Sequence, residues 1–107
     1  MKKLNVLLIC GTGASSGFMA ANMRNAAAEK GIDMEVKARS ESEIENYIDS
    51  VDCIMIAPHL AYLIDEIESY QDDYNISIIQ MKDHYYATLD GQEALEHLLS
   101  EIGNEGD

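Results

Sequence analysis

The sequence predicts an α/β fold: a small, doubly wound, open sheet of four parallel strands with helices on both faces. Short apolar runs alternate along the 107 residues with longer segments whose apolar residues recur at helical spacing, and this length suits one hydrophobic core. Right-handed crossovers favour the flavodoxin-like strand order 2-1-3-4. We expect one domain over residues 1–102 and a polar, frayed tail at residues 103–107.

The predicted strands are four apolar runs bounded by polar or turn-forming residues. Each run is of ordinary strand length and too short for an independent helix. They lie at residues 4–9, 34–38, 53–57 and 76–81.

Helices are predicted between and after these strands. The first covers residues 16–30 and ends before a glycine. Ser40 with Glu43 forms a capping box for the second, Pro58 fits the first turn of the third, and Asp90 is the N-cap of the last. The side chains expected to face inward are Phe18, Ala21, Met23, Ala26 and Ala27, then Ile44, Tyr47 and Ile48, then Leu60, Leu63, Ile64 and Ile67, and finally Ala94, Leu95, Leu98, Leu99 and Ile102.

The charge balance excludes some partners. The chain carries 20 acidic against 7 basic residues, a net charge of -13, which repels nucleic acid and anionic membrane surfaces. No apolar stretch approaches the roughly 20 residues of a membrane span, so no direct membrane insertion is expected. The acidic surface either only solvates the protein or steers it toward a basic patch on a partner. Two cysteines make no disulfide framework and favour a reducing cytoplasm.

The stretch LLICGTGASSGF, residues 7–18, holds the candidate site. It takes the first strand to Cys10 and then into small residues before a helix. In such sheets ligands bind beyond the carboxyl end of the strand at which the strand order reverses. Small side chains let backbone N–H groups converge on an anion, and the helix N-terminus adds attraction. The predicted phosphate-binding loop is Gly11, Thr12, Gly13, Ala14, Ser15, Ser16 and Gly17.

Several chemistries share such a loop. A dinucleotide loop fits poorly because Ser16 holds the third glycine position. The low-molecular-weight cysteine phosphatases, which this strand, cysteine and loop resemble, have an arginine at that same position to clamp the phosphate. A metal site of Cys10, His59 and His84 lacks any close ligand pair, so we expect no metal and no cofactor. The sequence also allows a second interpretation, a non-catalytic module that only binds phosphate.

Covalent phosphoryl transfer through Cys10 fits the loop best. A thiol near a helix N-terminus ionises more readily, and the thiolate is the nucleophile. No Lys or Arg occurs between Lys3 and Arg24. We hypothesise that a cradle of neutral dipoles holds a phosphoryl group without locking it, as suits a carrier.

The chain resembles the B component (IIB) of the sugar phosphotransferase system, in its lactose, cellobiose and chitobiose family. The likeness lies in KLNVLLIC, CGTGASSGFMAANM, VDCIMIAPHLAYLIDEI and DHYYATLDG, at the family's spacing from residue 1 to about 100. It implies a cytoplasmic phosphotransferase, transiently docked at the membrane, in which Cys10 accepts a phosphoryl group from a phosphohistidine of the A component (IIA). Cys10 then passes it to a sugar of this class carried by the membrane permease (IIC). Ala57 and His59 stand where the family leads us to expect Gly and Gln.

Other residues near the predicted loop carry weaker expectations. A rim that contacts partner proteins is one interpretation of them, and capping or core packing is the other. Cys53 is expected as a buried small hydrophobe, far from Cys10, and His97 as a surface residue of the last helix. The candidate rim residues are His59, Tyr62, His84, Tyr85 and Tyr86.

Overall fold

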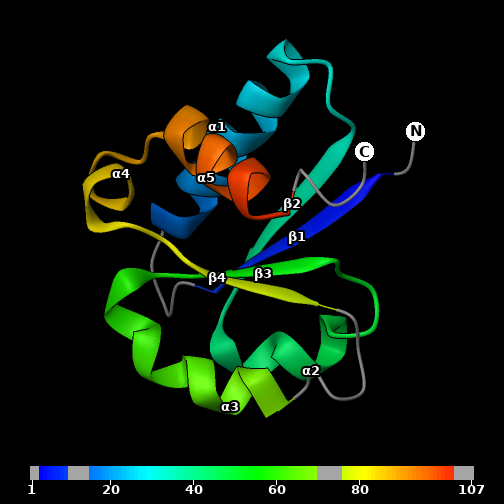
Figure 1. Ribbon diagram of the computed structural model, residues 1–107, viewed down its shortest axis with the longest axis vertical. Coiled ribbons are helices and arrows are strands. Elements are labelled where there is room, and N and C mark those ends of the chain that lie inside the picture. The colour runs from blue at the N-terminus through cyan, green and yellow to red at the C-terminus, as the bar shows by residue number, and fades with distance from the viewer. Residues whose placement is uncertain (1–2, 10–14, 70–75, 103–107) are drawn as a thin grey trace.

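The sheet has the predicted topology. The computed structural model describes residues 3–9, 15–69 and 76–102. Four parallel strands pair in the order β2-β1-β3-β4, which confirms the predicted order (Figure 1). They are β1 (Leu4–Ile9), β2 (Met34–Arg39), β3 (Cys53–Ile56) and β4 (Ser77–Gln80).

Helices cover both faces of the sheet. Two long helices, α1 (Ser15–Glu29) and α5 (Gly91–Ile102), pack against each other on one face (Figure 1). Two short helices, α2 (Ile44–Tyr47) and α3 (Ile64–Glu68), lie on the other face. Single 3₁₀ segments, η1 (Glu41–Glu43) and η2 (Pro58–Leu63), precede α2 and α3, and α4 (Asp83–Thr88) follows β4. The sheet is therefore doubly wound.

The central strands supply the core. Val6, Leu7, Leu8 and Ile9 of β1 are all buried, because helices cover both faces of a parallel sheet. The register places Val6 opposite Cys53 and Ile9 opposite Ile56. Met19, Met23, Met55 and Met81 are also buried.

Helix α1 buries Met23, Ala26 and Ala27 as predicted, but the predicted core residue Phe18 faces solvent. Phe18 is 63% exposed, whereas Met19, Ala20 and Met23 are buried. The prediction was wrong because most apolar residues of this helix are alanines, whose small side chains mark the buried face weakly. The one large ring was therefore taken as a core residue.

The second and third helices are less regular than predicted. At the second, the Glu43 N–H donates to the carbonyl oxygen of Ser40 at 3.0 Å, and no side-chain cap of the α2 N-terminus forms. The Ser40 hydroxyl instead donates to the Glu43 carboxylate at 3.4 Å. The third helix begins at Pro58 as predicted, but Leu60 has non-helical angles (φ -110, ψ 19) that kink η2 internally, before α3 begins at Ile64.

The last part of the chain holds both a confirmed and a missed helix. The Glu93 N–H donates to Oδ1 of Asp90 at 3.1 Å, which confirms the predicted N-cap of α5. A Cβ at Gly91 would overlap the backbone of Asn22, so a glycine is needed where α5 crosses α1. The segment DHYYATLDG, for which the sequence predicts no helix before Asp90, begins with α4.

Candidate functional site

The candidate site lies at the carboxyl edge of the sheet, where β1 ends at Ile9. Cys10 and the loop residues Gly11, Thr12, Gly13 and Ala14 lie outside the described residues. The backbone resumes at Ser15, so the predicted loop residues Ser15, Ser16 and Gly17 form the first turn of α1. That turn contains no acidic residue, which leaves its positive end available to an anion.

Two further segments reach the same edge through the parallel ladder. The Ala57 N–H donates to the carbonyl oxygen of Ile9 at 3.0 Å, and the Met81 N–H donates to that of Ile56 at 2.8 Å. Ala57 is fully buried, with φ -59 and ψ 147, a conformation open to any residue. The alanine found where the family pattern suggested glycine therefore causes no backbone strain.

These segments bring most of the candidate rim residues to the surface. Tyr62 is 72% exposed, and His59 and His84 are exposed too. The His59 ring lies 5.9 Å from the half-buried ring of Tyr86, measured between centroids. A contact thus links the segment after β3 to the helix after β4. The Nε2 atom of His84 lies 3.8 Å from a carboxylate oxygen of Glu93.

Tyr85 is not a rim residue. It is only 1% exposed and belongs to the hydrophobic core, so of its two expected roles it takes packing. Its hydroxyl lies 2.6 Å from Nδ1 of His97, whose side chain is 14% exposed. The expectation that His97 is a surface residue was wrong, because α5 turns this imidazole toward the buried tyrosine.

Phe18 is the exposed residue that sequence reasoning missed. It lies in the first turn of α1, just after the predicted phosphate loop. Among the described residues, Phe18 and Tyr62 are the large hydrophobic side chains that stand exposed. They belong to two elements, α1 and η2, that both begin at the carboxyl edge of the sheet.

Both arginines of the chain are engaged elsewhere. Arg24 donates from Nη1 to the carbonyl oxygen of Val36 at 2.7 Å. Arg39 pairs with Ile9 in the sheet, yet its guanidinium donates to the Tyr47 hydroxyl at 2.9 Å and to the Ala38 carbonyl at 2.7 Å. Their guanidinium groups are held by these backbone and side-chain oxygens.

The second thiol has the predicted inert character. Cys53 opens β3, is fully buried, and lies opposite Val6, three positions before the end of β1. Burial, followed by the Asp52 charge, raises the pKa of Cys53 to about 12. It stays a neutral thiol at ordinary pH and is a poor nucleophile.

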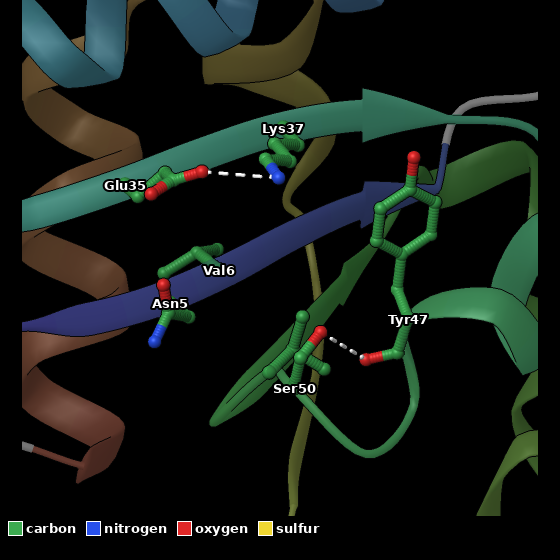
Figure 2. A pocket seen from close by; sticks show the side chains of 7 residues that line it. Asn5, Val6, Glu35, Lys37, Tyr47 and Ser50 are labelled. Carbon is green, nitrogen blue, oxygen red and sulfur yellow. Dashed lines mark hydrogen bonds and ion pairs between the residues drawn. The ribbon is translucent and has the colours of Figure 1, made fainter.

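A pocket of about 300 Å³ lies away from this edge, on the face that carries α2 (Figure 2). Lys37 reaches one carboxylate oxygen of Glu35 at 3.1 Å, and Lys3 reaches the other at 3.8 Å. The hydrogen bond and charge of Lys37 lower the pKa of Glu35, so the carboxylate stays ionised and its charge is neutralised locally. The lining residues are Asn5, Val6, Glu35, Lys37, Tyr47, Ser50 and Val51.

A second hollow, of about 610 Å³, lies beside α4 and α5. Its lining residues are Gln80, Met81, Lys82, Asp83, His84 and His97. Over residues 3–9, 15–69 and 76–102, no three His, Cys, Asp or Glu side chains gather as a metal site would require. None of the helices in that same part of the chain combines the length and apolarity needed to cross a membrane.

Comparisons with known proteins agree in both sequence and fold. A family model described as "PTS system, Lactose/Cellobiose specific IIB subunit" matches residues 5–97. The chain is 29% identical over 105 residues to the oligo-beta-mannoside-specific EIIB component of the PTS in Bacillus subtilis, covering 98% of this chain and all of that protein.

Two further relatives show the family's range. The chain is 29% identical to the lactose-specific EIICB component of Lactococcus lactis, over 88% of this chain but only 17% of that longer protein. The lactose-specific IIB domain structure from Streptococcus pneumoniae superposes with a TM-score of 0.85, covering 94% of this chain and 99% of that domain. Its sequence identity of 19% makes this a likeness of fold.

Proposed function

We propose that this chain, which belongs to the lactose/cellobiose-specific IIB subunit family of the sugar phosphotransferase system (PTS), relays a phosphoryl group through Cys10. The family match over residues 5–97 carries the proposal, because it includes Cys10 and the segments that follow β1, β3 and β4. The phosphate-binding groups are those of Gly11 to Gly17, and residues 1–102 act as one domain. The buried, neutral thiol of Cys53 leaves Cys10 as the nucleophile.

The relay consists of two displacements at phosphorus. First, the Cys10 thiolate attacks the phosphohistidine of a IIA protein: the S–P bond forms, the N–P bond breaks, and the imidazole leaves. Next, a sugar hydroxyl oxygen attacks the phosphocysteine: the O–P bond forms, the thiolate leaves, and the hydroxyl proton passes to a base or to water. The first turn of α1 stabilises the dianionic phosphoryl group between the two steps.

The arginines favour a carrier over a phosphatase. Rapid hydrolysis through a cysteine needs a guanidinium that clamps the phosphoryl oxygens. Ser16 occupies the position of that arginine, and the guanidinium groups of Arg24 and Arg39 are bound to other oxygens. Water therefore has no strong electrostatic help in attacking the phosphocysteine, and the phosphoryl group persists until an acceptor arrives.

Two partners follow from the relay. The donor is a phosphorylated IIA protein, and the acceptor is a sugar held by a IIC permease, as the name EIICB of the lactose-specific relatives suggests. The exposed rings of Phe18, Tyr62 and His59 offer contact area beside the Cys10 loop. The chain works in the cytoplasm and docks transiently at the membrane through the permease. The sugar belongs to the cellobiose, lactose and chitobiose class.

The proposal is tested by phosphorylation from a competent donor. The purified chain is incubated with phosphorylated IIA protein, and the intact mass and phosphopeptides are read by mass spectrometry. We expect one phosphoryl group, located on Cys10. It should be absent from Cys10→Ser and present in Cys53→Ala, the matched control that removes the buried thiol.

Two outcomes would contradict the proposal. A phosphoryl group that survives in a folded Cys10→Ser variant would place the chemistry on another residue. An unmodified chain, beside a donor that phosphorylates a known acceptor, would leave only non-covalent phosphate binding as the function of the loop.

A further inference from the structure

Helix α4 is too short to hold its own position. It has six residues, Asp83–Thr88, and isolated helices of this length are unstable in water. Its N-terminus follows Lys82, which is extended. Its C-terminus is capped by Leu89, which has a left-handed conformation (φ 56). A non-glycine residue persists there only when its surroundings enforce it. The contacts that fix α4 must therefore come from other elements.

One such contact lies at the C-terminal end of α4. The side-chain amide of Asn22 on α1 donates to the carbonyl oxygen of Leu89 at 2.7 Å. Gly91 follows directly and lets the chain pass close to the Asn22 backbone. The turn after α4 is thus attached to the helix that begins at the candidate site.

A second contact comes from the buried side of α4. The Tyr85 hydroxyl forms a hydrogen bond with Nδ1 of His97 at 2.6 Å. Burial, with a further contribution from Lys82, lowers the pKa of His97, so the ring is neutral near pH 7. Its Nε2 lies 3.7 Å from a Glu101 carboxylate oxygen, which favours the tautomer with the ring proton on Nε2 and with Nδ1 accepting from the Tyr85 hydroxyl. Burial also raises the pKa of Tyr85 to about 12, so the hydroxyl keeps its proton.

The position of α4 decides what stands at the carboxyl edge. Tyr86 follows Tyr85 on the same short helix, and its ring contacts that of His59 at 5.9 Å. His59 lies two residues after Ala57, whose N–H is bonded to Ile9, the last residue of β1. A shift of α4 would therefore move the surface against which the His59 ring rests.

We propose that Tyr85 is a positioning residue for phosphoryl transfer, whose hydrogen bond to His97 anchors α4 and thereby sets Tyr86 and His59 at the edge where the IIA donor docks. The proposal rests on the proposed relay function. Tyr85 does not touch the phosphoryl group in this role. It acts through its neighbour Tyr86. Removing the Tyr85 hydroxyl group alone should therefore slow phosphoryl transfer.

The test removes that hydroxyl while keeping the ring. In Tyr85→Phe we expect kcat/KM for transfer from phosphorylated IIA to fall about fivefold, the size of one net hydrogen bond, chiefly through a higher KM. The His59 ring resonances in the NMR spectrum should shift. Ser50→Ala, which removes an exposed hydroxyl that donates to the Tyr47 carbonyl oxygen at 3.0 Å, is the control and should change neither.

His97 supplies the second half of the test. His97→Asn keeps an acceptor near the position of Nδ1 and should retain most of the transfer rate, whereas His97→Leu should behave like Tyr85→Phe. The double variant, Tyr85→Phe with His97→Leu, should be no slower than either single variant, because both remove the same bond.

The outcomes separate this proposal from the relay itself. A wild-type chain that takes up no phosphoryl group from a competent donor would overturn the relay function and this proposal together. An active wild type beside a Tyr85→Phe variant with unchanged kcat, KM and His59 resonances would overturn the positioning role alone. A loss of rate in folded Tyr85→Phe with unmoved His59 resonances would also contradict it, because the effect would not pass through His59.

Discussion

Gly17 and Gly91 both stand in the first turn of a helix, yet their surroundings are opposite. A Cβ at Gly91 would overlap the backbone of Asn22, whereas one at Gly17 would meet none of residues 3–9, 15–69 and 76–102 within 4 Å. Gly91 is explained by the fold, since it lets α5 approach α1. Gly17 is not, because its helical backbone suits any residue and no part of the chain that the structure describes fills the space beside it.

The contrast extends to the regions around these glycines. The α1–α5 side is filled by buried residues such as Met23, Ala94 and Leu98. At the carboxyl edge, Phe18 and Tyr62 are exposed instead. The packing of the fold does not require these exposed residues. Exposed apolar residues that gather at one edge indicate a binding surface. We place the proposed donor protein at this carboxyl edge.

The largest effect is expected from Gly91→Ala. The added methyl group must push α5 away from Asn22, which should lower the free energy of unfolding by about 1–3 kcal/mol, as overpacking does. Urea denaturation measures this. Gln92→Ala, at an exposed neighbouring position, is the control and should change stability by less than about 0.5 kcal/mol. An unchanged Gly91→Ala would show that the α1–α5 side is not closely packed.

A smaller effect of opposite sign is expected from Gly17→Ala. Alanine favours helix over glycine, so the free energy of unfolding should rise by up to about 1 kcal/mol. Transfer from phosphorylated IIA should nevertheless slow about two- to fivefold, because the methyl group enters space kept for the partner or the phosphoryl group. Asn25→Ala, exposed further along α1, should leave transfer unchanged. Equal transfer rates in Gly17→Ala and wild type would remove Gly17 from the site.

The sequence predicts best what local pattern controls. The central strands β1 and β3 are mostly apolar runs because helices cover both faces of the sheet, and the N-cap at Asp90 needs only a neighbour three residues away. Cys53 could be placed as a buried thiol because it opens such a run. Cys10 and its loop are predicted from their place at the end of the first strand and from the small residues that follow, and the resemblance to the IIB family adds the expected donor and acceptor.

The sequence predicts least where distant contacts decide. Helix α4 ends on Leu89 rather than on a glycine, so it lacks the usual terminator, and its anchors His97 and Asn22 are far away in the chain. The burial of Tyr85 follows from the same contacts. Phe18 faces solvent because α1 turns Met19 and Met23 into the core instead, and hydrophobicity alone predicts the opposite.

The central claim is that Cys10 hands its phosphoryl group on rather than releasing it to water. The direct test follows radiolabelled phosphate from the isolated phosphorylated chain after adding membranes that contain a IIC permease of this class and its sugar. We predict that the label moves to the sugar only when permease and sugar are both present, and leaves slowly otherwise. Rapid release as inorganic phosphate, at the same rate with or without the acceptor, would contradict the carrier and identify a hydrolase.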